Sequence, residues 1–152
     1  MTSQPDIRIT LASTDAHITQ IKTLHNANLR RLLPVEVQER DGFVTAEYEV
    51  EYLAHIHKST PAVVALAQVD GAEQVVGYVL AATKTDSMSH NLLKDLVHFV
   101  DSNSSYNGKP LASTNYIVVG HFYLKSGKFE CAVTDVVSTN VISLRAHERR
   151  DG

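Results

Sequence analysis

Polar residues with ligand-binding chemistry gather near the carboxyl end of the chain. Residues 130–137 are rich in β-branched side chains and bounded by polar ones, which is typical of a buried or half-buried strand. Ser138, Thr139 and Asn140 are all good helix N-caps, and residues 141–150 can form a helix with basic side chains in its last turn. A strand that runs into a capped helix presents polar side chains and free backbone N–H groups at one edge of a sheet. Because α/β proteins bind ligands at such an edge, this stretch predicts a binding site.

The spacing of these polar residues is similar to a known motif. Ser143 follows Asn140 by three positions and His147 follows it by seven, and Glu148 comes next. This pattern resembles the C-terminal motif of the GCN5-related N-acetyltransferase (GNAT) family, Asn-x-x-small-x-x-x-Tyr-Glu-Lys-x-Gly-Phe. His147 stands where tyrosine is usual, Gly152 comes one residue late, and the chain ends before any phenylalanine.

The resemblance implies transfer of an acetyl group from acetyl-CoA to a primary amine of a small molecule or peptide. It assigns cofactor binding to Asn140 and Ser143, and to the backbone of a strand expected at residues 115–120. The backbone positions that would pair with the pantetheine arm are Ile117, Val118, Val119 and Gly120. His147 takes the position of the tyrosine that protonates the departing thiolate, and an imidazolium can also donate that proton. The residues themselves leave simpler roles open, since Asn140 suits an N-cap and His147 suits the C-terminal end of a helix dipole.

A second set of chemical groups lies on a helix predicted at residues 46–58. Thr45 can cap this helix, and Glu47 and Glu51 stand one turn apart near its positive end. In the acetyltransferase interpretation both are candidate catalytic residues, because a carboxylate can attract an amine or accept its proton. A solvated acidic face explains the same spacing and stays open as the alternative.

The first third of the chain predicts a strand and a long helix before these acids. Residues 7–11 alternate apolar and polar side chains, which is the period of a strand with one covered face. Ser13, Thr14 and Asp15 can each cap a helix, and apolar side chains then recur at helical spacing over residues 18–32 until Pro34 forbids continuation. Residues 35–44 are expected to form a polar connector.

The middle of the chain predicts a hairpin followed by a helix. Residues 62–70 and 74–83 are apolar runs joined by a short loop that contains glycine, which indicates an antiparallel hairpin. Gly77 inside the second run suggests a bulge or a close approach. A short helix is expected at residues 91–100 and a loop at residues 101–110.

The order strand, helices, hairpin and two further strands agrees with the fold that the resemblance implies. We therefore expect an α/β (α+β) protein with a mixed, mostly antiparallel central sheet, helices on both faces and the acyl-CoA N-acyltransferase (GNAT) fold. The length suits one domain, so residues 1–152 are expected to form a single GNAT-like unit.

The connection between the two last strands is shorter than this fold implies. In the family these strands are parallel, and a parallel pair needs a crossover of about a dozen residues or more, whereas only residues 121–129 lie between the expected strands. The pyrophosphate-binding signature Gln/Arg-x-x-Gly-x-Gly/Ala is also missing from them. Either a segment between Gly120 and His121 is absent from this sequence, or the protein has lost its cofactor loop. We favour the first, because deletion of the crossover would force the strands to pair with the opposite sense.

Composition restricts the partners. A net charge of −3 and a pI near 6.2 give no electrostatic reason to expect nucleic acid. The single cysteine, Cys131, excludes an intramolecular disulfide, and the eight histidines form no metal-binding pattern, so no metal is expected. No apolar run reaches the roughly 20 residues that span a bilayer, and the first residues do not resemble a secretion signal. We expect a cytoplasmic protein without membrane contact, and a homodimer stays open.

A rival hypothesis needs no catalysis. In it the protein is a catalytically silent domain of the same fold that binds a small ligand or a partner through the open cleft. This alternative gains weight if the chain is continuous at Gly120, because the pyrophosphate-binding half of the site would then be missing.

Overall fold

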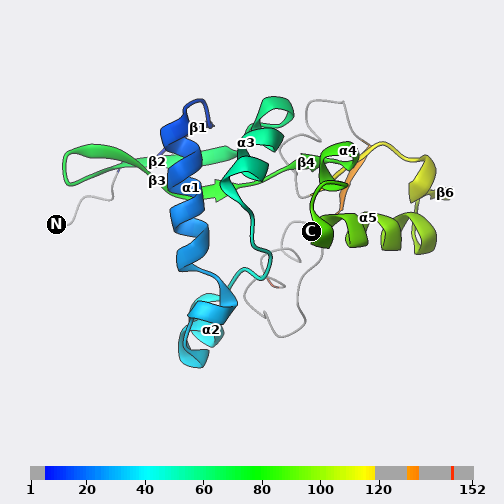
Figure 1. Cartoon of the computed structure of the whole chain (residues 1–152), viewed down its shortest axis with the longest axis horizontal. Coiled ribbons are helices and arrows are strands. Elements are labelled where there is room, and N and C mark those ends of the chain that lie inside the picture. Colours follow the sequence, from blue (N-terminus) through cyan, green and yellow to red (C-terminus); the bar gives the residue numbers. More distant parts are fainter. Residues whose placement is uncertain (1–5, 119–129, 134–144, 146–152) are drawn as a thin grey trace.

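The strands form two three-stranded sheets and one short hairpin (Figure 1). The computed structural model describes residues 6–118, 130–133 and 145. The strands are β1 (Arg8–Leu11), β2 (Val63–Val69), β3 (Ala72–Val79), β4 (Ala82–Thr83), β5 (Ser105–Tyr106), β6 (Lys109–Pro110), β7 (Tyr116–Val118) and β8 (Cys131–Val133). The helices are α1 (Asp15–Ala27), α2 (Val35–Asp41), α3 (Val50–Ser59), α4 (Lys84–Ser87) and α5 (Asn91–Asn103), with single 3-10 turns at Arg30–Leu32 and Leu111–Ser113.

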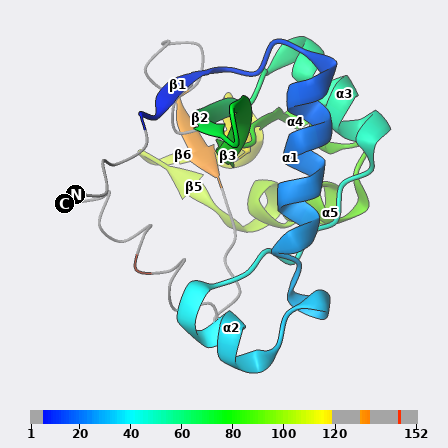
Figure 2. The same ribbon diagram turned by 90° about the vertical axis from the view of Figure 1, so that its left-hand side faces the viewer.

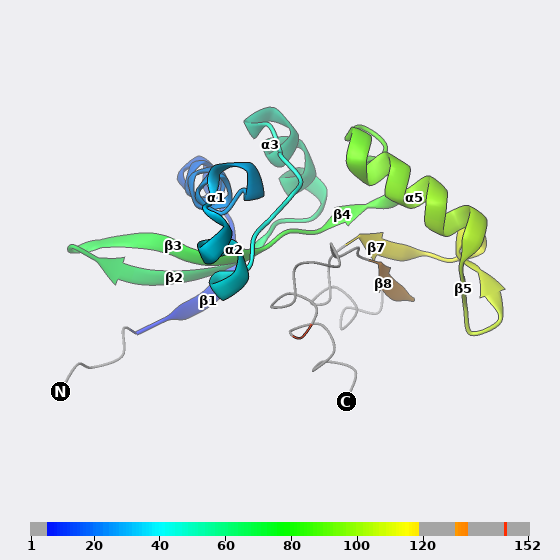
Figure 3. The same ribbon diagram turned by 90° about the horizontal axis from the view of Figure 1, so that it is seen from below.

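The two larger sheets follow one another along the chain. The first has the antiparallel order β1–β2–β3, and the second has the order β4–β7–β8. Only residues 80–81 separate β3 from β4, so the chain leads directly from one sheet into the next (Figure 3). In the second sheet β4 and β7 are antiparallel, whereas β7 and β8 are parallel. The expectation of a mixed, mostly antiparallel α+β architecture is confirmed at this level.

The predicted hairpin forms as β2 and β3, but the second run of residues 74–83 is divided, because β3 ends at Val79 and residues 82–83 are β4 of the other sheet. Asp70 and Gly71 have φ values of 50° and 82°, the left-handed values that a two-residue type I′ turn requires, and glycine adopts them without strain. Ala65 pairs with Gly77 while Leu66 pairs with Val75, so the register shifts by one residue beside Gly77. The bulge that the glycine suggested is therefore present.

Helices α1, α3 and α5 lie on the same side of the strands (Figure 3). Thr14 caps α1 by accepting a hydrogen bond from the His17 N–H at 3.1 Å, as the sequence predicts. One core cluster joins the helices to both sheets, and it includes Ile21, Leu53, Leu93, Val64 and Tyr116. Of the helix expected at residues 141–150, only Arg145 is among the described residues.

Two segments that the sequence assigned to connectors are regular structure. Residues 35–41 form α2, which projects away from the sheets beyond the end of α1 (Figures 1 and 2). Pro34 precedes its first turn and Gly42, at φ 79°, follows its last, which is the usual proline and glycine asymmetry of helix ends. Within the predicted loop, Asn107-Gly108 makes a positive-φ turn between β5 and β6.

The parallel pairing of β7 and β8 bears on the prediction that the connection between the two last strands is short. Tyr116 pairs with Cys131 and Val118 with Val133, so residues 119–130 connect the two strands. The described parts of the two strands thus have the parallel sense that was expected. The junction of Gly120 and His121 lies outside the described residues, and the hypothesis of an absent segment stays a prediction.

The burial of leucine side chains predicts how two substitutions change the free energy of unfolding. Leu53 on α3 is 1% exposed, whereas Leu92 on α5 is 42% exposed. Leu53→Ala should lower the free energy of unfolding by about 2–5 kcal/mol, because it removes buried methyl groups and leaves a cavity. Leu92→Ala, the same change in another helix, should cost less than about 1 kcal/mol. Urea denaturation followed by circular dichroism measures both, and equal losses would show that α3 does not anchor the core.

Candidate functional site

The residues of the predicted site divide between the described and the remaining parts of the chain. Val119, Gly120, Asn140, Ser143 and His147 all lie outside the described residues. Their assignment to the cofactor and to proton transfer stays a prediction. Ile117, Val118, Glu47 and Glu51 are described, and the structure places them in three separate settings.

Ile117 and Val118 lie in the middle of the second sheet. Their side chains are 0% and 1% exposed. On one edge of β7 Ala82 is opposite Val118, and on the other edge Val133 is opposite Val118. Described strands therefore flank both edges of β7 at these positions, and no edge is open there to an extended ligand.

Glu47 and Glu51 do not share a helix. Helix α3 begins at Val50, so Glu47 belongs to the segment before it, and Glu51 is an exposed residue of the first turn. The Arg31 guanidinium holds the Glu47 carboxylate through two bonds, Nη2 to Oε1 at 2.5 Å and Nε to Oε2 at 3.1 Å. This hydrogen bonding lowers the pKa of Glu47. A carboxylate stabilised in its ionised form is a weak proton acceptor, so Glu47 suits electrostatic attraction better than base catalysis.

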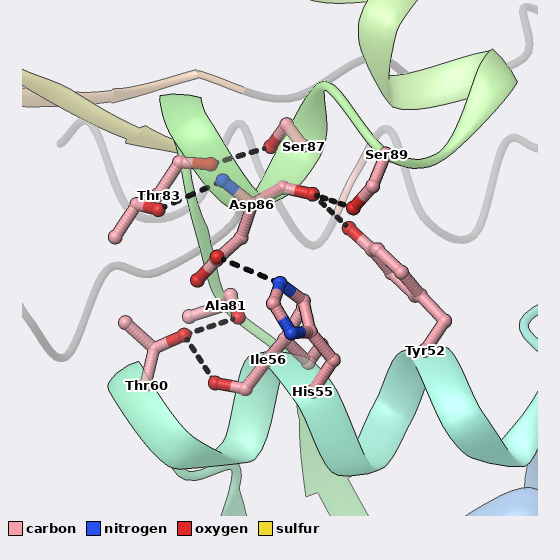
Figure 4. Close-up of polar contacts among 9 residues, drawn as sticks. All are labelled: Tyr52, His55, Ile56, Thr60, Ala81, Thr83, Asp86, Ser87 and Ser89. Carbon is pink, nitrogen blue, oxygen red and sulfur yellow. Dashed lines mark hydrogen bonds and ion pairs between the residues drawn. The ribbon is translucent and has the colours of Figure 1, made fainter.

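A polar cluster that the sequence did not indicate surrounds Asp86 (Figure 4). Thr83 ends β4 and caps α4, and its Oγ1 accepts a hydrogen bond from the Asp86 N–H at 3.1 Å. The Asp86 carbonyl accepts bonds from the Ser89 hydroxyl at 2.8 Å and the Tyr52 hydroxyl at 3.2 Å. The backbone of Asp86 is thereby fixed between β4 and α3.

The Asp86 side chain faces His55 on α3. Its Oδ1 lies 3.1 Å from the His55 Nε2, and the Asp86 side chain is 9% exposed while that of His55 is 53% exposed. The second carboxylate oxygen, Oδ2, is buried and has no hydrogen-bond partner among the described residues. A buried carboxylate therefore supports an imidazole that is open to solvent (Figure 4).

Tyr52 connects this cluster to a group of aromatic rings. Its ring stacks on Tyr48 with centroids 5.8 Å apart, and the His90 ring lies 4.8 Å from Tyr48 and 5.1 Å from Tyr52. The His90 Nε2 is bonded to the Glu47 carbonyl at 2.7 Å. Burial raises the pKa of Tyr52, so its hydroxyl stays a donor over the neutral range.

His25 is the buried histidine of the same region, at 3% exposure. Its Nε2 is 2.5 Å from the Ala46 carbonyl, which can only accept, so Nε2 carries the proton. In the neutral ring Nδ1 then accepts from the Tyr78 hydroxyl at 2.5 Å. Burial lowers the pKa of His25, partly opposed by the bond to Ala46. His25 therefore ties α1 to β3 and to the segment before α3 as an uncharged group.

Two further findings limit the chemistry of the described residues. Among them, no three histidine, cysteine, aspartate or glutamate side chains gather closely enough to hold a metal ion. None of their helices combines the length and apolar character needed to cross a membrane.

Comparison of the chain with protein-family models, with curated proteins and with solved structures finds no match.

The state of His25 predicts how stability depends on pH. The folded pKa lies below the ordinary value of 6.5, so the unfolded chain takes up the proton first as the pH falls. The free energy of unfolding should therefore be highest above about pH 7 and decrease towards pH 5. His25→Gln can keep both hydrogen bonds without titrating, so its stability should decrease less steeply over this range.

Urea denaturation at pH 7, 6 and 5 measures the effect. His57, whose pKa burial also lowers, should leave part of the slope in the His25 variant. His98→Gln, at an exposed position of α5, is the control and should keep the wild-type slope. An unchanged slope in His25→Gln would exclude His25 as a source of the pH dependence.

Proposed function

We propose that the protein is an acetyl-CoA-dependent N-acetyltransferase that acts on a primary amine of a small molecule or peptide. The observation that carries this proposal is the position of β7, which lies between antiparallel β4 and parallel β8. The resemblance based on Asn140, Ser143 and His147 implies this neighbourhood for the strand that receives the thioester. The sequence motif and the strand pairing are independent supports for the same fold family.

In this proposal the thioester lies beside Val119 and Gly120, which follow the described part of β7 in the sequence. Backbone groups at Val119 and Gly120 would orient the thioester carbonyl, a contribution of positioning and of preorganised hydrogen bonds. Asn140 and Ser143 would bind the cofactor, and His147 would give a proton to the departing thiolate. Glu47, fixed as a carboxylate by Arg31, would attract the cationic acceptor.

A second candidate is a catalytically silent domain of the same fold that binds a ligand or a partner protein. The sequence observation that favours it is the missing pyrophosphate signature in residues 121–129. The two candidates differ in whether acetyl-CoA is bound and consumed.

Calorimetry with the full chain tests the proposal. Acetyl-CoA should bind at one site with a dissociation constant below about 1 mM, the upper end of usual substrate affinities. A thiol-detection assay with spermidine, tyramine, lysine and a short peptide as acceptors should then show CoA release that depends on the amine. CoA without the acetyl group is the control ligand. Binding without turnover would favour the silent domain, and no binding would contradict the proposal.

His147 gives a sharper test of the proposed chemistry. His147→Phe keeps an aromatic ring but removes the proton donor, so kcat at saturating acetyl-CoA should fall by roughly 10²-fold. The acetyl-CoA dissociation constant should change far less, because the cofactor contacts are assigned to other residues. Unchanged turnover would remove His147 from the mechanism.

A further inference from the structure

The Asp86 carboxylate is placed at an energetic cost that its local role does not explain. Its side chain is 9% exposed, and Oδ2 finds no partner in the described part of the chain. A buried polar atom without a partner destabilises the folded state, because it has lost its hydrogen bonds to water. Such atoms are uncommon in native proteins and gather where they serve another purpose.

Capping of α4 is the ordinary explanation for a threonine and an aspartate at these positions. It accounts for the contact of the Thr83 hydroxyl but not for the position of the Asp86 carboxylate. Thr83 and Asp86 have the spacing of a capping box, in which the hydroxyl and the carboxylate each bond the other residue's backbone N–H. The hydroxyl half forms, since Thr83 Oγ1 accepts from the Asp86 N–H. The carboxylate instead turns away from the helix end towards His55 (Figure 4).

The contact with Asp86 determines which nitrogen of His55 can act. A carboxylate can only accept, so we assign the ring proton of His55 to Nε2, which lies 3.1 Å from Oδ1. In the neutral ring Nδ1 is then the unprotonated nitrogen, and the side chain is 53% exposed. A buried carboxylate that fixes the tautomer of an accessible imidazole is the arrangement that general-base histidines use.

The fold holds this pair beside the strand proposed to receive the thioester. Asp86 follows Thr83 by three residues, and Thr83 is opposite Ile117 of β7. Thr60, at the end of α3, donates to the Ala81 carbonyl at 2.9 Å and so fastens the helix of His55 to the chain just before β4. Both members of the pair are thus anchored to β4, the neighbour of β7.

We propose that His55 is the proton acceptor for the amine substrate and that Asp86 is its positioning residue. This inference rests on the proposed acetyltransferase function and extends it to an acceptor that arrives as an ammonium ion. His55 Nδ1 takes one proton from the ammonium and releases it to solvent. The neutral amine nitrogen of the acceptor forms the new C–N bond to the thioester carbonyl carbon as the C–S bond breaks. The second amine proton passes from nitrogen to solvent, and the thiolate leaves as a thiol after it gains a proton from His147.

Three variants of the full chain test the pair. His55→Ala should lower kcat roughly 10²-fold with the acceptor that the wild type uses best, while the acetyl-CoA dissociation constant changes less than about twofold. Asp86→Asn should lower kcat with a smaller effect on KM, because it misorients the base without removing it. His98→Ala, at an exposed position of α5, is the matched control and should keep wild-type kinetics.

Imidazole in the assay separates a chemical role from a structural one. His55 is exposed, so free imidazole can occupy the space in His55→Ala and should restore at least tenfold of the lost rate, but it should not accelerate the wild type. Circular dichroism and calorimetry confirm that each variant is folded and binds acetyl-CoA. If wild type turns over and His55→Ala stays within twofold of it, or shows no rescue, the inference fails alone. If wild type acetylates none of the amines, the proposed function fails and the inference fails with it.

Discussion

The structure depends on one apolar layer that α1, α3 and α5 share with both larger sheets. Neither sheet has more than three described strands, and their inward side chains, such as Val64 of β2 and Val118 of β7, belong to the same buried cluster. Because β4 follows β3 after only two residues, any helix that packs on this layer fixes the two sheets relative to each other. Burial of the shared apolar surface therefore determines the geometry of every polar group at the β4–β7 boundary.

Local signals predicted the parts of the fold that local interactions decide. The β2–β3 hairpin, the Thr14 cap and the bulge beside Gly77 each depend on a few adjacent residues, and each is present. Comparable local signals exist for two segments that were not predicted as regular structure. Pro34 and Gly42 flank α2, and Asn107-Gly108 is a typical turn pair between β5 and β6. Both segments are polar and lack hydrophobic periodicity, so the sequence analysis predicts a connector and a loop there.

The site could not be predicted in the same way, because long-range packing decides it. Asp86 and His55 are separated in the sequence by the last turn of α3, a hairpin and β4, and no spacing rule connects them. His55 is exposed, and nothing in the sequence around it indicates its buried partner. For Glu47 a spacing rule was applied where it does not hold. The predicted one-turn spacing to Glu51 needs a helix that includes both residues, but α3 begins only at Val50.

The two histidine sites show how burial separates structural from chemical roles. His25 has both ring nitrogens satisfied by Ala46 and Tyr78, and its burial keeps it neutral, so it has no capacity left for a ligand. In the pair of His55 and Asp86 the carboxylate is the buried group, and the imidazole is exposed to solvent. The same two residue types thus give a rigid brace in one place and an available base in the other. The difference arises from which partner the packing of α3 against β4 places inside the core.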